Sequence, residues 1–284
     1  MDLQWYPGHM AKTRRLIAEN LKLIDVVVEI LDARVPLSSR NPDFDDLLCS
    51  KPRIIVMNKY DLADDSATKA WQAWYEKSGV SVLLTDSLLG KGIDKISATA
   101  KNAIADKIAR DAERGLTKSV RIMVVGIPNV GKSSLINRLS GRACAKTGDK
   151  PGVTKGKQWI RPNSQIEILD TPGILWPKFE NQQIGLNLAF IGSIRDEIMD
   201  VETLACKLLE FLRDNYCDML CARYKLDGDI SQMSGYELLE YVGKKRGFVI
   251  SGGEIDTYRG ANVVLDEFRG ARIGKITLEM PPEN

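Results

Sequence analysis

The stretch Gly126-Ile-Pro-Asn-Val-Gly-Lys-Ser133 decides the fold of this chain of 284 residues. It matches the phosphate-binding loop G-x-x-x-x-G-K-[ST], and it follows an apolar segment, 120–125, and precedes a helix-like segment, 132–139. In such a loop the backbone N–H groups surround nucleotide phosphates, the lysine adds positive charge, and the hydroxyl ligates Mg2+. We therefore predict a nucleotide-binding α/β domain. The residues expected at the phosphates are Asn129, Val130, Gly131, Lys132, Ser133 and Ser134, with Ser133 also on Mg2+.

Segments on either side of this loop extend the α/β pattern. Four further strand candidates, each short and apolar inside, are 25–31, 53–57, 80–84 and 165–169. Strands buried on both faces of a parallel sheet have this composition, and the helix-like runs 41–49, 66–78 and 92–114 lie between them. From about residue 179 the pattern is helical, over 201–212, 216–224, 235–246 and 254–269. We predict a domain over 1–180, with an N-terminal segment over 1–20, and a smaller, mainly α-helical domain over 181–284.

A guanine-recognition motif closes one of the strands. Asn58-Lys-Tyr-Asp61 has the form N-K-x-D and follows 53–57. A carboxylate at Asp61 accepts hydrogen bonds from guanine N1–H and the 2-amino group, whereas adenine presents an acceptor there and would leave the carboxylate unpaired. Asn58 is expected to bridge the base and the phosphate loop, and the stem of Lys59 to lie on the ring. After the next strand, Asp86 and Ser87 are expected to back the base.

The γ-phosphate and metal side is expected from two later segments. Asp170-Thr-Pro-Gly173 follows the strand 165–169, so Asp170 can hold Mg2+ and the Gly173 N–H can meet the γ-phosphate. Thr154, in Lys150-Pro-Gly-Val-Thr154, is expected to complete the Mg2+ shell as a switch ordered by GTP.

The order of these motifs is that of a circularly permuted GTPase. The guanine motif (58–61) and the loop expected to back the base (85–87, the base loop) precede the phosphate loop (126–133), whereas in the usual order they come last. We therefore expect a circularly permuted P-loop GTPase domain followed by the helical domain. The D-x-x-G segment then leads directly into the helical domain, and the γ-phosphate can reorient that domain.

In its permuted motif order and in several local stretches, the sequence resembles a known family, that of ribosome biogenesis GTPase A (RbgA or YlqF). The stretches are Trp5-Tyr-Pro-Gly-His-Met10, Ile30-Leu-Asp-Ala-Arg-Val-Pro-Leu-Ser-Ser-Arg-Asn-Pro42, Asp170-Thr-Pro-Gly-Ile-Leu-Trp-Pro177 and Arg259-Gly-Ala-Asn-Val-Val264. The resemblance implies a GTPase that acts late in assembly of the bacterial large ribosomal subunit. It implies that the helical domain contacts ribosomal RNA, that the subunit stimulates hydrolysis, and that the protein is released afterwards.

Catalysis needs a group other than the usual glutamine. The position after D-x-x-G is Ile174, which cannot orient water. The only histidine, His9, lies in a Tyr-Pro-Gly-His turn, and the resemblance implies that it acts on the attacking water. The alternative is a histidine that only packs in that turn. Asn129 is implied by similar GTPases as a K+ ligand, and the alternative is an asparagine that stabilises its own loop.

Composition limits the remaining function classes. The net charge is +2, from 40 basic and 38 acidic residues, so an RNA-binding surface requires local clustering. Basic residues gather in three places: Lys12, Arg14 and Arg15; Arg142, Lys146, Lys150, Lys155, Lys157 and Arg161; and Lys244, Lys245 and Arg246. No segment is long and apolar enough to span a bilayer and no signal peptide is evident, so we expect a cytoplasmic protein, with a monomer favoured. Five dispersed cysteines indicate reduced thiols, without a metal role for Cys217 and Cys221.

Two alternatives to a ribosome-assembly GTPase stay open on the sequence. One is an RNA-binding scaffold that uses GTP as a structural ligand, which Ile174 keeps open. The other is a P-loop phosphotransferase, which the N-K-x-D motif and the lack of an evident acceptor site disfavour. A hydrolysis rate that is unaffected by His9→Ala would favour the scaffold.

Overall fold

The computed structural model describes residues 7–48, 51–141, 158–176, 181–194 and 200–282, with side chains described from Arg14 onward. The chain forms two compact units. The first comprises residues 1–184 together with 277–284, and the second comprises Gly185–Ile276. The boundary expected after residue 180 therefore falls inside the first unit. Residues 277–284, which we expected in the helical domain, also belong to the first unit.

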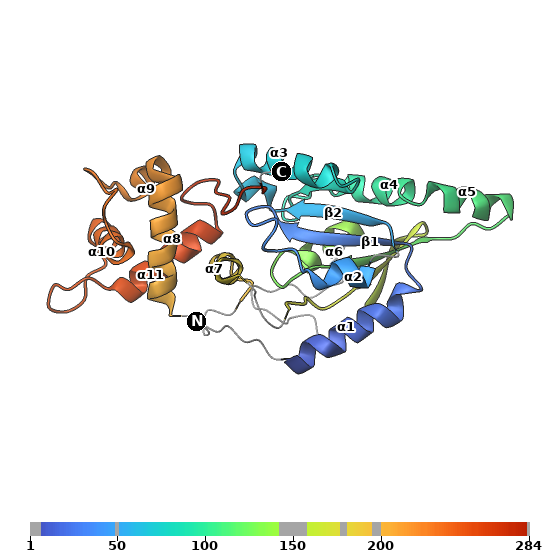
Figure 1. Ribbon diagram of the computed structural model, residues 1–284, viewed down its shortest axis with the longest axis horizontal. Coiled ribbons are helices and arrows are strands. Elements are labelled where there is room, and N and C mark those ends of the chain that lie inside the picture. The colour runs from blue at the N-terminus through green and yellow to red at the C-terminus, as the bar shows by residue number, and fades with distance from the viewer. Residues whose placement is uncertain (1–6, 49–50, 142–157, 177–180, 195–199, 283–284) are drawn as a thin grey trace. The chain divides into compact units, whose positions relative to one another are not determined.

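The first unit is built on a six-stranded sheet with the order β3-β2-β1-β4-β6-β5 (Figure 1). Its strands are β1 (Val26–Asp32), β2 (Arg53–Asn58), β3 (Ser81–Thr85), β4 (Val120–Val125), β5 (Gln158–Asn163) and β6 (Ile166–Asp170). All neighbouring pairs are parallel except β5 and β6, which are antiparallel. The strand β5 was not expected, because most of its side chains are exposed and it lacks the apolar run that marks the other five.

The register of the parallel strands explains why the motifs meet. Asp32 pairs with Asn58, and Asn58 pairs with Thr85, so β1, β2 and β3 end side by side. On the other side of β1, Val124 near the end of β4 pairs with Asp170 at the end of β6. Ligands of open parallel α/β sheets bind at this carboxyl edge. The register therefore brings the predicted guanine and phosphate motifs to one edge.

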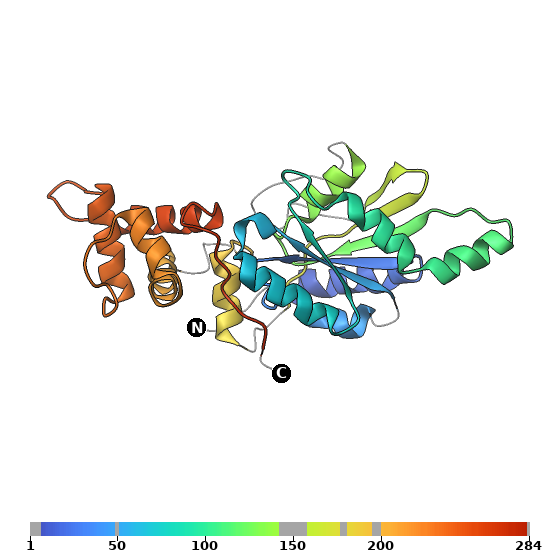
Figure 2. The same ribbon diagram turned by 90° about the horizontal axis from the view of Figure 1, so that it is seen from above.

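Helices cover both faces of this sheet (Figure 2). The helices of this unit are α1 (Pro7–Leu21), α2 (Asp43–Leu48), α3 (Asp65–Glu76), α4 (Asp94–Asn102), α5 (Ala105–Glu113) and α6 (Lys132–Ser140), with a 3-10 turn over Tyr60–Leu62. The single helix expected over 92–114 is two helices, since α4 buries Ile96 and Ala100 whereas α5 buries none of its residues. The expected N-terminal turn is instead the first turn of α1, which begins at a proline, a favoured first helical residue.

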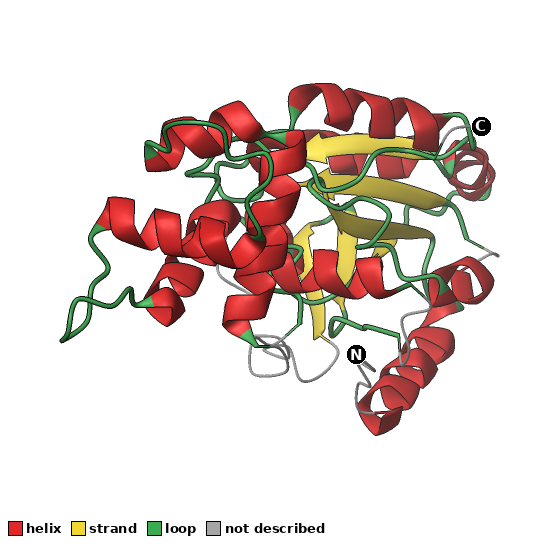
Figure 3. Ribbon diagram, turned by 60° about the vertical axis from the view of Figure 1, so that its left-hand side comes forward, coloured by secondary structure: helices red, strands yellow, loops and turns green. Residues whose placement is uncertain are grey.

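The second unit is helical, as predicted (Figure 3). It contains the later part of α7 (Gln182–Phe190), then α8 (Val201–Asn215), α9 (Cys217–Tyr224), α10 (Gly235–Arg246) and α11 (Thr257–Arg269). A Cβ on Gly235 would lie 2.5 Å from the Cys206 carbonyl oxygen, so the start of α10 crosses α8 in close contact. Ser234 and Glu237 form a capping box at that helix start. Arg269 donates to the carbonyls of Ala189 and Phe190 at 3.0 Å each, which satisfies the end of α7.

After the second unit the chain returns to the first unit. The Leu278 N–H donates to the Arg34 carbonyl at 2.8 Å, and the Thr277 hydroxyl accepts from the Asp64 N–H at 3.1 Å. The Trp71 indole N–H donates to the Glu279 carbonyl at 2.9 Å. The helical unit is therefore an insertion between two segments of the first unit. In the described part of the chain, no helix combines the length and the apolar character that a bilayer span requires.

Candidate nucleotide-binding site

The phosphate loop joins β4 to α6 and depends on two glycines. Gly126 and Gly131 have φ of 153° and 97°, conformations that disfavour any side chain. A Cβ on Gly126 would lie 2.6 Å from the Ile30 carbonyl oxygen, and one on Gly131 would lie 2.2 Å from the Asn58 Nδ2. Only glycine lets the loop approach β1 and the guanine motif this closely. Asn129 also has a positive φ, 62°, which asparagine tolerates better than most residues.

Lys132, the first residue of α6, is buried inside the loop. Its ammonium donates to the carbonyls of Gly126 at 3.1 Å and Ile127 at 2.7 Å. Burial lowers the pKa of this lysine to about 8, and the nearby Asp170 carboxylate opposes that shift. The loop thus holds a cation where phosphates would bind to its N–H groups. Ser133 and Ser134 follow in the first turn of the same helix.

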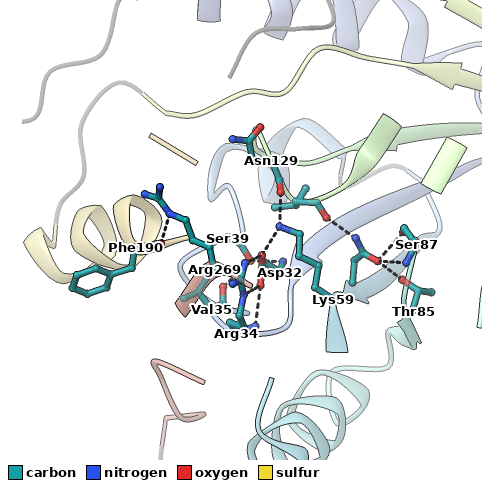
Figure 4. A network of polar contacts seen from close by, with 12 residues as sticks. Asp32, Arg34, Val35, Ser39, Lys59, Thr85, Ser87, Asn129, Phe190 and Arg269 are labelled. Atoms are coloured by element: carbon teal, nitrogen blue, oxygen red, sulfur yellow. Dashed lines mark hydrogen bonds and ion pairs between the residues drawn. The ribbon is translucent and has the colours of Figure 1, made fainter. Parts of the chain in front are cut away.

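Asn58 connects the phosphate loop to the loop of Thr85 and Ser87, which lies at the expected base position. Figure 4 shows Thr85 and Ser87 side by side. The Asn58 amide nitrogen donates to the Val130 carbonyl at 2.7 Å. Its amide oxygen accepts from the Thr85 hydroxyl at 3.1 Å, from the Ser87 N–H at 3.1 Å and from the Ser87 hydroxyl at 2.7 Å. The side chain is buried, and every one of these contacts is with the protein itself. Asn58 therefore locks the base loop to the phosphate loop.

Asp61, the carboxylate expected to read the base, lies on the 3-10 turn after β2. Burial and the neighbouring Asp86 raise its pKa, while its own backbone N–H, Arg34 and Lys91 oppose the shift. Asp86 accepts from the N–H groups of Leu88 and Leu89 through one oxygen, at 2.9 Å each, and its other oxygen is buried without a hydrogen bond. Two carboxylates at one site favour a ligand that brings hydrogen-bond donors, as the guanine edge does.

Three residues of this region were missed by sequence reasoning. Arg138 of α6 donates to the Ser87 carbonyl at 3.3 Å and to the Leu88 carbonyl, so it fixes the base loop. Asp32 lies 3.1 Å from the Lys59 ammonium and forms a bidentate pair with Arg34, at 2.9 and 2.8 Å. Burial opposes ionisation of Asp32, but the charges of Arg34 and Lys59 hold its pKa well below the usual range. The position of Asp32 at the end of a buried strand was the available signal.

The metal side of the site is less complete. Asp170 ends β6 and is buried, and its Oδ1 has no hydrogen-bond partner. Burial raises its pKa to about 6, against the effect of Lys132. A buried carboxylate oxygen without a donor fits Mg2+, which takes one or two protein carboxylates together with phosphate and water oxygens. Among the described residues no cluster of three His, Cys, Asp or Glu side chains could hold a metal, so such an ion would need those other oxygens. Thr154 lies outside the described residues.

The segment after Asp170 lies against the phosphate loop. The Thr171 hydroxyl donates to the Val124 carbonyl at 2.7 Å. A Cβ on Gly173 would lie 2.8 Å from the Lys132 ammonium and 2.8 Å from the Pro128 nitrogen. The Ile174 N–H then donates to the Gly126 carbonyl at 3.3 Å. This glycine therefore lies beside the position expected for the γ-phosphate.

Ile174 and α1 share one hydrophobic core. Ile174 is 6% exposed and packs in a cluster with Ile17 and Leu21 of α1 and with Leu169 of β6. A side chain buried in this way cannot orient water, in agreement with the argument from sequence. The backbone of His9 lies in the first turn of α1, and its side chain lies outside the described residues.

The structure brings most of the predicted site residues to one edge of the sheet. These are Asn58, Lys59, Asp61, Asp86, Ser87, Asn129, Val130, Gly131, Lys132, Ser133, Ser134, Asp170 and Gly173. Thr154 and the side chain of His9 are not among them, because both lie outside the described residues.

Comparisons with known proteins agree with this geometry. A family model described as 50S ribosome-binding GTPase matches residues 121–233. A GDP-bound structure of YlqF superposes with a TM-score of 0.69 at 26% identity, covering 95% of this chain and 100% of that chain. The predicted P-loop GTPase fold is thereby confirmed.

Two relatives match over nearly the whole length. Ribosome biogenesis GTPase A of Bacillus cereus is 46% identical over 284 residues, which cover 100% of this chain and 95% of that protein. Ribosome biogenesis GTPase A of Thermotoga maritima is 31% identical over 99% of this chain and 95% of that protein. With its permuted motifs gathered at one sheet edge and this identity along its length, the chain is a GTPase and belongs to the ribosome biogenesis GTPase A family.

Proposed function

We propose that this GTPase is an assembly factor for the bacterial large ribosomal subunit, that it binds ribosomal RNA in its GTP state, and that it is released after hydrolysis. The observation that carries the proposal is the identity along the whole chain to proteins named ribosome biogenesis GTPase A. The second unit begins at Gly185, and only a short segment of chain separates it from Gly173. A conformational change of the D-x-x-G segment at the γ-phosphate can therefore act on the helical unit through this short connection.

Within this proposal, Ser133, Thr154 and Asp170 hold Mg2+, which shields the charge of the β- and γ-phosphates. The unpaired Asp170 oxygen supports its part in this set. Asn129 is proposed as a K+ ligand through its side chain. Its left-handed backbone and the bond from Lys59 to its carbonyl, at 2.7 Å, equally support the alternative role of shaping the loop.

His9 is proposed to orient the attacking water. Ile174 leaves that task to another group, and the cluster shared by Ile174 and Ile17 joins the D-x-x-G segment to the helix that carries His9. His9 precedes Ile17 by eight residues, which corresponds to about 12 Å along a helix. The segment that responds to the γ-phosphate therefore packs against the same helix that would deliver the imidazole.

The second unit presents residues suited to RNA. Lys244, Tyr258 and Arg259 are exposed on α10 and α11, and Tyr258 is 62% exposed. Exposed aromatic rings stack on unpaired bases and cations neutralise phosphates. Lys245 and Arg246 are engaged with Asp227 and Glu267, so the basic run contributes less free charge than its sequence indicates. We infer that the protein acts as a monomer in the cytoplasm, where bacterial ribosomes are assembled.

The test is GTP turnover in KCl and in NaCl buffer, with and without purified large ribosomal subunits. We expect stimulation of at least tenfold by the subunits, equivalent to about 1.4 kcal/mol of barrier. His9→Ala should abolish the stimulated rate while GTP binding persists, and Glu19→Ala, an exposed position on the same helix, should leave it unchanged.

A second candidate, an RNA-binding scaffold that uses GTP as a structural ligand, is favoured by the burial of Ile174. It predicts tight GTP binding without stimulation by the subunit, and a basal rate that does not respond to His9→Ala. That result would overturn the assembly GTPase mechanism. Equal turnover in KCl and NaCl would overturn only the K+ role of Asn129.

A further inference from the structure

A buried ion pair beside the guanine motif has no part in the functions assigned so far. Asp32 is the last residue of β1 and its side chain is 0% exposed, while that of Arg34 is 2% exposed. The guanidinium donates twice to the carboxylate, and the Arg34 N–H adds a third bond at 3.1 Å. The cost of removing two charges from water largely offsets their attraction, so a buried ion pair is weak evidence for a contribution to stability. We therefore consider a role of this pair in the nucleotide site.

Lys59 is the third charged member of this group. Its ammonium lies 3.1 Å from Asp32 Oδ2 and donates to the Asn129 carbonyl at 2.7 Å (Figure 4). Lys59 also has a left-handed backbone, with φ of 60°, so its side chain leaves the end of β2 in a fixed direction. The Lys59 ammonium is therefore held by β1 through Asp32 and by the phosphate loop through Asn129. These two contacts fix the position of the lysine stem.

The loop that carries this ion pair is held by the C-terminal segment Thr277–Glu279. The Arg34 carbonyl accepts from the Leu278 N–H at 2.8 Å. The Glu279 carboxylate accepts from the N–H groups of Leu37 and Ser38 and from the Ser38 hydroxyl. Both ends of the segment 34–38 are thus fixed by residues more than two hundred positions later in the chain.

We propose that Asp32 is a positioning residue of the guanine site, which acts through Lys59, and that the segment Thr277–Glu279 holds the loop in which Asp32 and Arg34 pair. Asp32 keeps the Lys59 ammonium at the Asn129 carbonyl, so the lysine stem is fixed where the base lies and the phosphate loop is joined to β1. Asp32 does not touch the nucleotide.

The test is a double-mutant cycle on the affinity for a fluorescent GDP analogue, in the full-length chain with Mg2+. Asp32→Asn should raise Kd about tenfold or more in the wild-type background, and less than about twofold in the Lys59→Met background, because contacts that act as a unit are not additive. At saturating GTP the kcat of Asp32→Asn should stay within about twofold of wild type, since the metal side is untouched.

Asp25→Asn is the matched control. Asp25 directly precedes β1, so it sits at the opposite end of the same strand, where it pairs with Lys107 and accepts from the Arg121 N–H. It should leave the affinity for GDP unchanged. Equal losses from Asp32→Asn with and without Lys59 would overturn the proposal and leave the ion pair a purely structural role.

Glu279→Ala covers the case in which Asp32→Asn does not fold. It removes acceptors from the loop and leaves the ion pair itself intact. We expect a rise in Kd for GDP of about threefold, which disappears in the Lys59→Met background. An unchanged Kd in folded Glu279→Ala overturns the role of the C-terminal segment, and a loss that persists with Lys59→Met overturns its action through Lys59.

Discussion

The nucleotide site has a base half, around Asn58 and Ser87, and a metal half, around Asp170. The two halves differ in how many of their polar atoms are hydrogen-bonded within the protein. Around the base, Asn58, Ser87 and Lys59 are held by one another and by the phosphate loop, in bonds of 2.7–3.1 Å. On the metal side, the Asp170 Oδ1 is buried without a hydrogen bond, and Ile174 occupies the position of a water-orienting glutamine. The base half is preorganised by this network and leaves one buried oxygen, Asp86 Oδ2, for a ligand to satisfy, whereas the metal half depends more heavily on atoms that a ligand supplies.

This difference separates recognition from chemistry. A preorganised base half binds guanine nucleotide without first ordering its side chains, so little entropy is lost on binding. With an incomplete metal half, hydrolysis would depend on the added ion and on the ribosomal subunit, as proposed above. Substitutions in one half should therefore change affinity, and those in the other should change turnover.

The largest effect is expected at the metal half. Asp170→Asn removes the charge proposed to face Mg2+ while preserving side-chain shape. We expect kcat to fall about 10³-fold, equivalent to about 4 kcal/mol, because metal-assisted charge stabilisation contributes several kcal/mol. Affinity for GDP in EDTA should not change. Glu167→Gln on the same strand, where the carboxylate pairs with Arg121, is the control. A parallel loss of GDP affinity in EDTA would show that the halves are not separable.

The next largest effect is expected on stability, at Glu29 of β1, the strand between the two halves. Burial raises its pKa to about 7 from 4.5, and Arg53, at 3.4 Å, opposes the shift. A folded-state pKa above the unfolded one means that the folded chain binds the proton more tightly. This contribution to stability is therefore full below about pH 4.5 and is lost as pH rises through about 7. It amounts to on the order of 3 kcal/mol.

Urea unfolding of wild type and Glu29→Gln at pH 5 and pH 8 checks this expectation. The wild type should lose stability relative to the variant between the two values, and both the fluorescence and the nucleotide-binding transitions should shift together. Separate transitions would show that nucleotide binding is lost before the chain unfolds, and an unchanged difference between wild type and variant would contradict the raised pKa of Glu29.

Asp61→Asn acts on the base half. An amide oxygen still accepts from guanine N1–H, but the amide NH2 meets the 2-amino group, donor against donor. We expect GTP affinity to fall by about 2 kcal/mol, near thirtyfold. Xanthosine nucleotides, whose 2-oxygen accepts from that NH2, should bind better. Titration with both nucleotides measures the change, and the exposed Asp65→Asn serves as control. Unchanged preference for guanine would remove Asp61 from base recognition.

Ser87→Ala should give the smallest effect. It removes the hydroxyl that donates one of the three hydrogen bonds to the Asn58 amide oxygen. The other two donors, the Ser87 N–H and the Thr85 hydroxyl, remain. A loss of about 1 kcal/mol in GDP affinity is expected, with kcat at saturating GTP unchanged. A change confined to kcat would contradict the division between the two halves.

Sequence predicted the strands at the centre of the sheet, because strands buried on both faces read as apolar runs ending in polar residues. It also predicted the motifs that meet at the carboxyl edge of the sheet, since N-K-x-D and the phosphate loop follow such strands directly. The exposed strand β5 gives no such pattern and was missed. The break between α4 and α5 was missed because helical periodicity continues through residues 103–104.

Interactions that depend on register or on distant chain could not be predicted. Asp32 lies beside the guanine motif only because β1 pairs with β2 so that Asp32 faces Asn58. Arg138 reaches the base loop from the far end of α6. The return of Thr277–Glu279 to the first unit follows a whole helical unit, and local composition contains no sign of it.

The insertion of the helical unit also determines when the segment 34–38, called the guanine loop here, can form all its contacts during protein synthesis. Leu37 and Glu279 are separated by 242 residues. At about 5–20 residues per second, translation takes about 12–48 s to supply the carboxylate that accepts from the Leu37 N–H. The helices of the second unit emerge within that interval and can pack first. The first unit, although it starts the chain, is therefore the last to acquire all its native contacts, and a chain stalled before Thr277 would have folded helices and an unsecured guanine loop.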